Sequence, residues 1–387
     1  MKYAIITFLA STLTAAAVIT PAPAFSQSTT PQSSPTQPTS DPQKAATLKQ
    51  QAVDLMDNGD PEKALLLLDS AQRLDPGNYV YRYEMGYAYY VKKDYPAAIR
   101  LFRQTTTFAD ITDQCYQMLG NAYDMNNERA KAREAYAEGL RRFPNAGRLY
   151  MESGITYLAE KSYDTAAALW EKGVQVEPNY PSNYFRLAKL FAQTDERIWA
   201  VLYGELFMNI ERGSDRTAEI SKLLFDAYKQ SIHFSDTSLS VTLDMTSKTI
   251  LVKSNPDPKD LHLPFRLNYT LALTTGLAPF PLTATKRELS IAAVSNARTL
   301  FVDIWFNKLK LAKQFPNNVL LDYQHTINEK GYLEEYNYWL LMKGNEEEFN
   351  AWYKDHKEKF DAFIKWYGDN PLQLDKDHLL VRTQYDQ

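Results

Sequence analysis

The residues that could carry out catalysis or bind a metal are scattered along this chain. The five histidines show no metal-ligand spacing; they are His233, His262, His325, His356 and His378. The sequence contains no HExxH pair, no glycine-rich phosphate loop and no G-x-S-x-G turn. Asp355 and His356 are neighbours in a charged stretch, which is typical of a solvated histidine. We therefore predict no enzymatic activity, no metal and no cofactor.

One alternative function remains open, because some active sites leave no motif. A pair of carboxylates such as that of a glycosidase has no simple sequence signature. An enzyme with an unrecognised site in the C-terminal half is therefore the alternative. Cys115 is the only cysteine, so no disulfide can form within the chain. Its expected role is that of a small buried residue inside a helix.

Charge and composition exclude some classes of partner. The net charge is −4 with both signs mixed along the chain, and 44% of residues are hydrophobic, as in an ordinary folded protein. The sequence has no basic stripe of the kind that binds nucleic acid, so we expect no nucleic-acid partner. A mildly acidic surface also does not attract anionic lipid.

The N-terminus has the pattern of a signal peptide over residues 1–24. Lys2 precedes an apolar run, Ala4–Thr20, and Ala22-Pro23-Ala24 offers the small-x-small site that signal peptidase needs. The alternative is an uncleaved membrane anchor, for which this run is at the short limit. No second segment approaches membrane length, so we predict an exported protein that is periplasmic, surface-exposed or secreted. Residues 25–44, rich in Ser, Thr, Pro and Gln, are expected to be a flexible tether.

A period of 34 residues organises the next part of the chain. Pro76, Pro144 and Pro178 are separated by multiples of 34, and the register they set starts repeats at Ala45, Tyr79, Asp113, Gly147 and Pro181. The eighth position is always small: Ala52, Gly86, Gly120, Gly154 and Ala188. The twentieth is always alanine: Ala64, Ala98, Ala132, Ala166 and Ala200. Large residues recur at the twenty-fourth position: Leu68, Phe102, Tyr136 and Trp170, with Gly204 as the exception.

These columns predict pairs of antiparallel helices that approach closely where side chains are small. We expect positions eight and twenty to face each other, with the large residues filling the space beside them. The turn chemistry agrees, because Asp60 and Pro61 suit the start of a second helix. Ser162 is expected to cap the equivalent helix of the fourth repeat.

The pattern resembles the tetratricopeptide repeat over residues 45–212, which implies five repeats. The outer repeats depart from it, since Gln51 replaces the usual leucine and Arg212 the usual proline. A further helix within 213–233 is expected to cap the array. The fold class predicted is all-α, a repeat superhelix followed by a mainly helical C-terminal part.

The resemblance implies a concave groove lined by the first helix of each pair. Positions two, five, nine and twelve usually point into it, which identifies these candidate peptide-binding residues: Tyr83, Tyr87, Tyr90, Gln117, Asn121, Asp124, Met151, Ile155, Leu158, Phe185 and Lys189. Tyrosine gives large contact area with few rotors to freeze, which suits peptide recognition. The alternative is that these tyrosines pack on one another. The Lys and Asn pair by which some members hold a terminal carboxylate is absent, so that mode is not expected.

Residues 234–387 match no named family and are expected to be mainly helical. Weak alternation over Ser238–Asp244 and a β-branched run at Thr249–Val252 allow a short hairpin. Helical periodicity covers about 288–314, 319–342 and 346–367, with Gly331 marking a turn. The last of these helices is rich in aromatic residues, which either form a partner surface or pack into the local core. Packing into the core is the expected role.

The hypothesis is an exported scaffold that binds a protein or peptide partner, in envelope assembly, secretion or host interaction. The alternatives are the enzyme described above and a carbohydrate-binding protein that uses exposed aromatic residues. A scaffold predicts a continuous groove, an enzyme a cleft with converging carboxylates, and a sugar binder coplanar exposed rings. The sequence does not name the partner.

Overall fold

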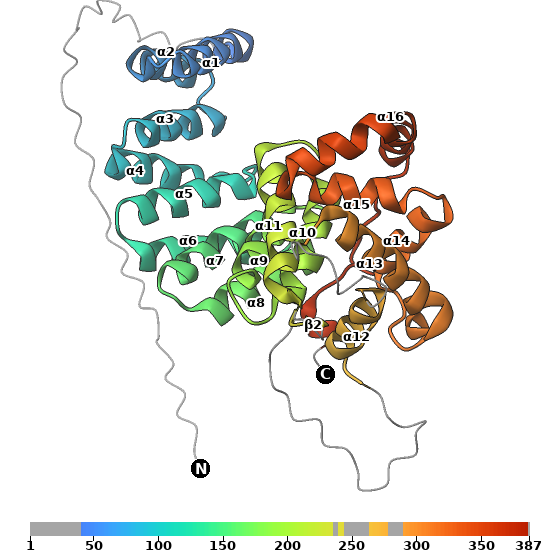
Figure 1. Cartoon of the computed structure of the whole chain (residues 1–387). Helices are drawn as coiled ribbons and strands as arrows, with labels where there is room; N and C mark the ends of the chain where they lie inside the picture. Colours follow the sequence, from blue (N-terminus) through green and yellow to red (C-terminus); the bar gives the residue numbers. More distant parts are fainter. Residues whose placement is uncertain (1–39, 235–238, 244–262, 278–288, 386–387) are drawn as a thin grey trace, which may run out of the picture. The chain divides into compact units, whose positions relative to one another are not determined.

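A computed structural model describes residues 40–234, 239–243, 263–277 and 289–385 (Figure 1). These residues are almost entirely helical, with one two-stranded sheet, which confirms the predicted all-α repeat fold. Residues 41–387 form one compact unit. The predicted signal peptide and nearly all of the predicted tether lie outside the described residues.

The repeat part consists of five helix pairs and one further helix. The pairs are α1 (Pro42–Asp57) with α2 (Pro61–Leu74), α3 (Val80–Val91) with α4 (Tyr95–Thr105), α5 (Asp113–Met125) with α6 (Arg129–Arg142), α7 (Gly147–Ala159) with α8 (Tyr163–Val176), and α9 (Pro181–Phe191) with α10 (Arg197–Ile210). The next helix, α11 (Asp215–Ser231), packs on α10 and begins with a capping box at Ser214 and Thr217.

The small eighth position makes room for the large twenty-fourth residue of the same repeat. In the first repeat the small residues at positions eight and twenty, Ala52 and Ala64, lie with Leu68 in one buried cluster, as expected. A Cβ atom on Gly120 would lie 2.1 Å from the ring of Tyr136. Gly86 and Gly154 have the same relation to the aromatic rings of their own repeats. At the exceptional Gly204, a Cβ atom would lie 2.8 Å from Leu224 of α11. The missing side chain there lets the capping helix approach.

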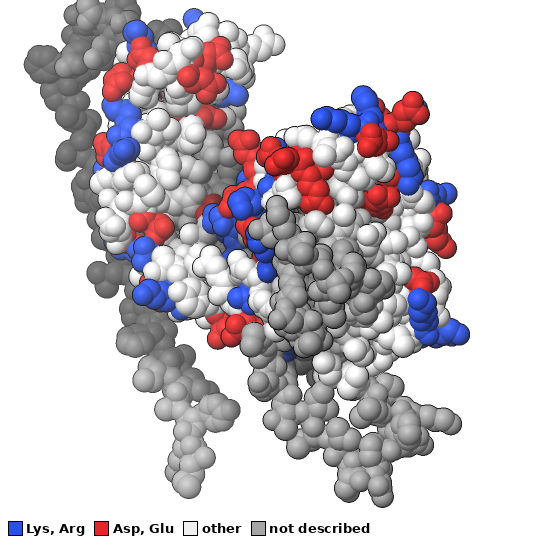
Figure 2. All heavy atoms as spheres, viewed as in Figure 1, with Lys and Arg blue, Asp and Glu red and all other residues white. Residues whose placement is uncertain are grey.

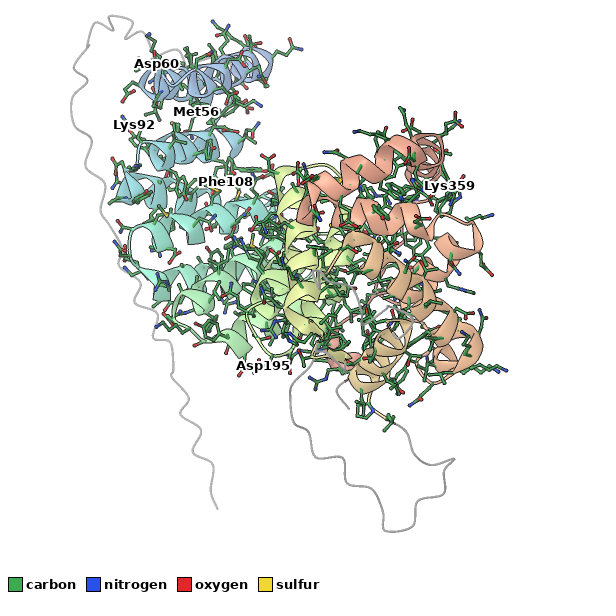
Figure 3. The ribbon with its side chains drawn as sticks, viewed as in Figure 1. Met56, Asp60, Lys92, Phe108, Asp195 and Lys359 are labelled. Atoms are coloured by element: carbon green, nitrogen blue, oxygen red, sulfur yellow. The ribbon has the colours of Figure 1, made fainter. Side chains whose placement is uncertain are left out.

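The turn between the helices of a pair is the same in the first four repeats. The residue at the fifteenth position of each of these repeats has a positive φ: Gly59, Lys93, Asn127 and Lys161. In the second repeat the N–H of Lys93 donates to Tyr90 O and that of Asp94 to Tyr89 O, both at 2.9 Å. This is a Schellman ending, which closes a helix tightly before the next one starts. Asp195, at the fifteenth position of the fifth repeat and labelled in Figure 3, is not among the positive-φ residues.

The caps of the second helices are only partly as expected. Asp60, labelled in Figure 3, accepts from the N–H of Lys63 at 3.2 Å, which confirms it as the cap of α2. Ser162 precedes α8, but its side chain makes no capping hydrogen bond, so that prediction was wrong. The Schellman turn already positions this helix start, since the N–H of Ser162 donates to Tyr157 O.

Within its described residues, the C-terminal part contains a hairpin and five α-helices, besides short π- and 3-10 helices. The strands β1 (Ile232–Phe234) and β2 (Leu239–Val241) are antiparallel, with Ile232 opposite Val241. The helices are α12 (Phe265–Leu277), α13 (Ile291–Asp303), α14 (Val319–Glu329), α15 (Leu333–Leu341) and α16 (Glu346–Asp369). A hairpin was expected, but its first strand lies earlier than predicted, and Thr249–Val252 lies outside the described residues. Helix α12 was not predicted.

The turn at Gly331, between α14 and α15, is of the same Schellman type as the turns within the repeats. The φ of Gly331 is +75°, and the N–H groups of Gly331 and Tyr332 donate to Asn328 O and Ile327 O. With Gly331 in the fifteenth position, the eighth and twentieth positions of this helix pair are Gln324 and Tyr336. Both are polar and buried, where the repeats place small residues.

The aromatic residues of α16 form local core, as expected. Phe360, Phe363 and Tyr367 are buried. The ring of Trp352 stacks on Tyr338 of α15 with centroids 3.9 Å apart. The side chain of Lys359, labelled in Figure 3, pairs with the buried Glu335 of α15 at 2.9 Å. This helix is therefore anchored along its inner face.

The hydrophobic core becomes larger along the chain. The start of the array has two small clusters: Ala52, Ala64 and Leu68 lie within the first repeat, and Ala45 and Ala71 of that repeat join Tyr81 of the second. A middle cluster runs from Ala98 to Leu149. The largest runs from Met151 to Val381 and so includes both the later repeats and the C-terminal helices.

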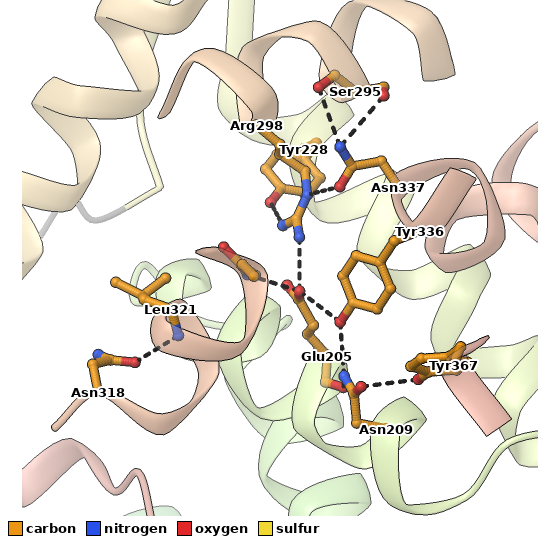
Figure 4. A network of polar contacts seen from close by, with 11 residues as sticks. Glu205, Asn209, Tyr228, Ser295, Arg298, Asn318, Leu321, Tyr336, Asn337 and Tyr367 are labelled. Atoms are coloured by element: carbon orange, nitrogen blue, oxygen red, sulfur yellow. Dashed lines mark hydrogen bonds and ion pairs between the residues drawn. The ribbon is translucent and has the colours of Figure 1, made fainter. Parts of the chain in front are cut away.

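A buried polar network joins α10 to the C-terminal helices (Figure 4). Glu205 of α10 is fully buried, and its Oε1 accepts from Arg298 Nη2 at 2.7 Å, Gln324 Nε2 at 2.7 Å and the Tyr336 hydroxyl at 2.9 Å. Arg298 of α13 also donates to Asn337 and Tyr228. A buried carboxylate is tolerated only when charge and hydrogen bonds compensate it, so this network fixes the positions of α13, α14 and α15.

The C-terminal segment after α16 returns to the repeats. Arg382 Nε donates to Glu171 of α8 at 3.1 Å, and its backbone N–H donates to the Tyr203 hydroxyl at 2.9 Å. Asn179, between α8 and α9, donates to Leu374 O at 3.0 Å. Residues 374–382 therefore pack against the last two repeats.

Gly120→Leu tests the close approach inside a repeat. The added side chain would enter the space of the Tyr136 ring, so we expect a loss of about 3 kcal/mol in the free energy of unfolding. Gly77→Ala is the control, because no atom lies within 4 Å of its Cβ position. Urea unfolding followed by circular dichroism measures both. Equal stability of the two variants would show that the assigned contact is wrong.

Arg298→Met tests the network at α10. The substitution leaves the Glu205 charge buried without a cation, so the free energy of unfolding should fall by about 3–5 kcal/mol. Adding Glu205→Gln removes that charge while keeping an acceptor for Gln324 and Tyr336. The double variant should recover a large part of the loss in the same denaturation experiment. A double variant no more stable than Arg298→Met would argue against a charge-driven effect.

Candidate peptide-binding groove

The first helices of the pairs lie next to one another along the array. Contacts join α1 to α3, α3 to α5, α5 to α7, α7 to α9 and α9 to α11. The candidate groove residues come from α3, α5, α7 and α9 of this series. Acidic and basic side chains are interspersed on the visible face of the described residues (Figure 2), without an extended field of one sign.

The three candidate tyrosines of α3 differ in how freely they face the groove. The ring of Tyr83 packs on Phe102 with centroids 5.6 Å apart, and that of Tyr90 packs edge-on to Tyr95 at the same distance. Tyr87 is 39% exposed. The expectation that groove tyrosines pack on their neighbours therefore fits Tyr83 and Tyr90, while Tyr87 is available to a ligand.

The centre of the groove is a polar cluster between α5 and α7. Gln117 Nε2 donates to Glu152 Oε1 at 2.7 Å, and Asn121 Nδ2 donates to the same oxygen at 3.4 Å. The hydroxyl of Tyr136, from α6, donates to Asn121 Oδ1 at 2.6 Å. The amides are therefore oriented by contacts on both sides.

Two ion pairs flank this cluster. Asp124 accepts from Arg129 Nε at 3.0 Å. Asp113 accepts from Arg148 Nε at 3.1 Å, and Arg148 also reaches Gln117 Oε1 at 3.5 Å. The predicted groove residue Asp124 thus has its charge balanced within the chain.

The later groove candidates are mostly part of the core. Met151 and Phe185 are buried, and the ring of Phe185 packs on Phe207 at 5.3 Å. Ile155 and Leu158 are half-buried against the same core. Lys189 pairs with Glu219 of α11 at 2.5 Å. The structure therefore brings the α3 and α5 candidates together at an accessible surface but places Met151 and Phe185 beneath it.

Sequence reasoning missed Glu152, Tyr136 and Tyr180, which complete the centre of the groove. Glu152 is at the sixth position of its repeat, one beyond the expected column. It contacts Gln117 across a separation of 35 residues, one repeat plus one. A search of the sequence for polar pairs separated by one repeat plus one residue could have found this contact.

Three tyrosine hydroxyls lie within electrostatic reach of Glu152. The pKa of Tyr90 is raised, first by burial and then by Tyr95 and Glu152. Burial also raises the pKa of Tyr136 and Tyr180, and the Glu152 charge adds to both. These phenols therefore stay protonated around a carboxylate.

The described residues give little support to a catalytic or sugar-binding site. A cavity of about 710 Å³ lies between Leu263–Phe265, Lys310–Phe315 and Gln384–Tyr385, and its lining contains no carboxylate. Within the same ranges, no group of His, Cys, Asp and Glu could hold a metal ion. The exposed aromatic side chains there are Tyr87 on α3 and Tyr163 on α8, two repeats apart and so not a coplanar pair.

A comparison with protein families decides the nature of the repeat. A sequence model of the tetratricopeptide repeat matches residues 49–110 and 118–184. Residues 49–110 and 118–184 therefore carry tetratricopeptide repeats. Members of this family generally serve as scaffolds for protein interaction, and this chain has that architecture over α1–α10.

Solved tetratricopeptide repeat proteins resemble part of the chain. MamA of Desulfovibrio magneticus RS-1 is 20% identical, with a TM-score of 0.36, over 45% of this chain and 98% of its own. PilF of Pseudomonas aeruginosa is 18% identical, with a TM-score of 0.40, over 47% of this chain and 82% of its own. A thermophilic protein of Thermus thermophilus is 16% identical, with a TM-score of 0.39, over 46% and 98%. No curated protein sequence matches this chain.

Tyr83→Ala and Tyr87→Ala separate packing from exposure in the tetratricopeptide groove. Tyr83 contacts Phe102, so its removal should lower the free energy of unfolding by about 2 kcal/mol. Tyr87 is more exposed, so its removal should change stability by less than about 0.5 kcal/mol. Thermal and urea denaturation measure both. Comparable destabilisation by the two substitutions would mean that Tyr87 is also a structural residue.

Proposed function

We propose that this tetratricopeptide repeat protein is an exported scaffold that binds a protein or peptide partner in the groove formed by α3, α5 and α7. The observation that carries the proposal is the accessibility of the groove centre. Tyr87 is exposed, and Gln117, Asn121 and Glu152 are half-exposed, with the C-terminal helices in place. The C-terminal helices contact α11 through α15 and hydrogen-bond to Glu205 of α10.

The groove is preorganised for binding, which favours a scaffold. Tyr136 orients Asn121 through a hydrogen bond of 2.6 Å, and Glu152 orients Gln117 through one of 2.7 Å. A ligand that binds here does not have to order these side chains, so less conformational entropy is lost on association.

Export is the part of the proposal that rests on the sequence pattern of residues 1–24. Among the described ranges, no helix is long and apolar enough to span a membrane. We place the scaffold in the periplasm, at the cell surface or outside the cell, in envelope assembly, secretion or host contact. The identity of its partner would decide between these processes.

Cross-linking of the mature protein in its native envelope fraction, followed by mass spectrometry, tests the proposal. Tyr87→Ala removes an exposed ring from the groove, and Tyr163→Ala removes one of similar exposure from α8, outside it. We expect one main partner to be recovered by the wild type and by Tyr163→Ala, and several-fold less by Tyr87→Ala. Equal recovery by both variants would place the contact elsewhere, and no recovery by any form would remove the main support for a scaffold.

A further inference from the structure

Most carboxylates along the groove are paired with a cation of the same chain. Asp113 pairs with Arg148, Asp124 with Arg129 and Glu219 with Lys189. Glu152 differs, because its contacts are the amides of Gln117 and Asn121, both at Oε1. Its Oε2 has no hydrogen-bonding or ionic partner within the described ranges. Glu152 is therefore a partly exposed carboxylate that forms no ion pair within the described ranges; the nearby Arg148 contacts Gln117 rather than Glu152.

A comparison between repeats shows what is missing beside Glu152. Glu84 occupies the sixth position of the second repeat, as Glu152 does in the fourth. Burial raises the pKa of Glu84, while the charge of Lys49, 35 residues earlier, lowers it. At the same offset from Glu152 stands Gln117. A lysine charge thus acts on Glu84, although the two side chains form no ion pair, while a neutral amide contacts Glu152.

The surroundings of Glu152 suit a cation more than an anion. Burial first, and then nearby charges that include Glu152, raise the pKa of Tyr90, Tyr136 and Tyr180, so neutral phenols lie near this carboxylate. The N–H donors of Gln117 and Asn121 already point at Glu152, so they are not free to hold a carboxylate. Arg148, four residues earlier on α7, points to Asp113 instead.

We propose that Glu152 receives a lysine or arginine side chain of the bound peptide, with Tyr87 and Tyr90 lining its path. This inference rests on the proposed function of the groove and adds the chemical class of the ligand. The incoming cation brings to Glu152 the positive charge that Lys49 brings near Glu84. A charge-assisted hydrogen bond forms at Oε2, while Oε1 keeps its two amide donors.

The test uses the whole mature chain and three pools of acetylated, amidated hexapeptides. One pool carries Lys and Arg, one Asp and Glu, and one only neutral residues, and each carries a fluorophore for anisotropy. Blocking the termini removes their charges, so only side chains differ. We expect the basic pool to bind, and to bind more weakly as salt is raised.

Two variants remove the unpaired charge without removing the groove. Glu152→Gln keeps an acceptor for Gln117 and Asn121, and Gln117→Lys supplies the internal cation that Lys49 provides elsewhere. Each should weaken binding of the basic pool by at least about tenfold at an unchanged melting temperature. Glu160→Gln, at an exposed glutamate of the same helix region that pairs with Arg133, is the control and should bind as the wild type does.

The outcomes separate this inference from the scaffold proposal. Equal binding of the basic pool by Glu152→Gln and the wild type would overturn the role of Glu152. Preference for the acidic or neutral pool, or no binding of any pool, would overturn it as well. In each of these cases the proposal that the groove binds a partner would still hold if Tyr87→Ala lost the cross-linked partner. That proposal would be contradicted only if Tyr87→Ala retained the partner or if no partner were recovered.

Discussion

The packing of the later repeats against the C-terminal helices depends on the charge of Glu205, which is fully buried on α10. An ion of this kind is stable inside a protein only when a counter-ion and hydrogen bonds replace the lost water. Arg298, Gln324 and Tyr336 supply them from three different helices (Figure 4). The later repeats and the C-terminal helices therefore have to assemble together, which agrees with the single hydrophobic core that runs from Met151 to Val381.

The repeat part could be read from the sequence because its packing is periodic. In successive repeats a small eighth residue packs against a large twenty-fourth residue. The same residue types therefore recur every 34 residues, which makes the pattern visible in the sequence. The C-terminal helices carry no such repetition. Helix α12 was missed because apolar residues cover two of its faces: Phe265, Ala272 and Leu273 are buried, while Leu267 and Leu271 are exposed. That pattern has no single apolar stripe.

Groove residues could be predicted only where the position within a repeat alone decides whether the side chain is accessible. The α3 and α5 candidates follow from their positions within a repeat, but Met151 and Phe185 occupy equivalent positions and are buried. The difference arises because α9 packs against α10 and α11, which belong to the largest core. Glu152 was missed since its environment is set by the preceding repeat, through contacts with Gln117 and Asn121. Contacts between repeats are not visible in any one column.

Because the core clusters differ in size, local unfolding of the repeat array should start at one end. The first repeat is held by two small clusters, one of which it shares with Tyr81 of the second repeat, whereas α10 lies in the largest core and carries the Glu205 network. In a solenoid each repeat depends on its neighbours, so fraying starts at α1 and stops before α10. A ligand that contacts α3, α5 and α7 would link the less stable early repeats to the more stable later ones. Its binding would therefore slow amide hydrogen exchange even in repeats that it does not contact.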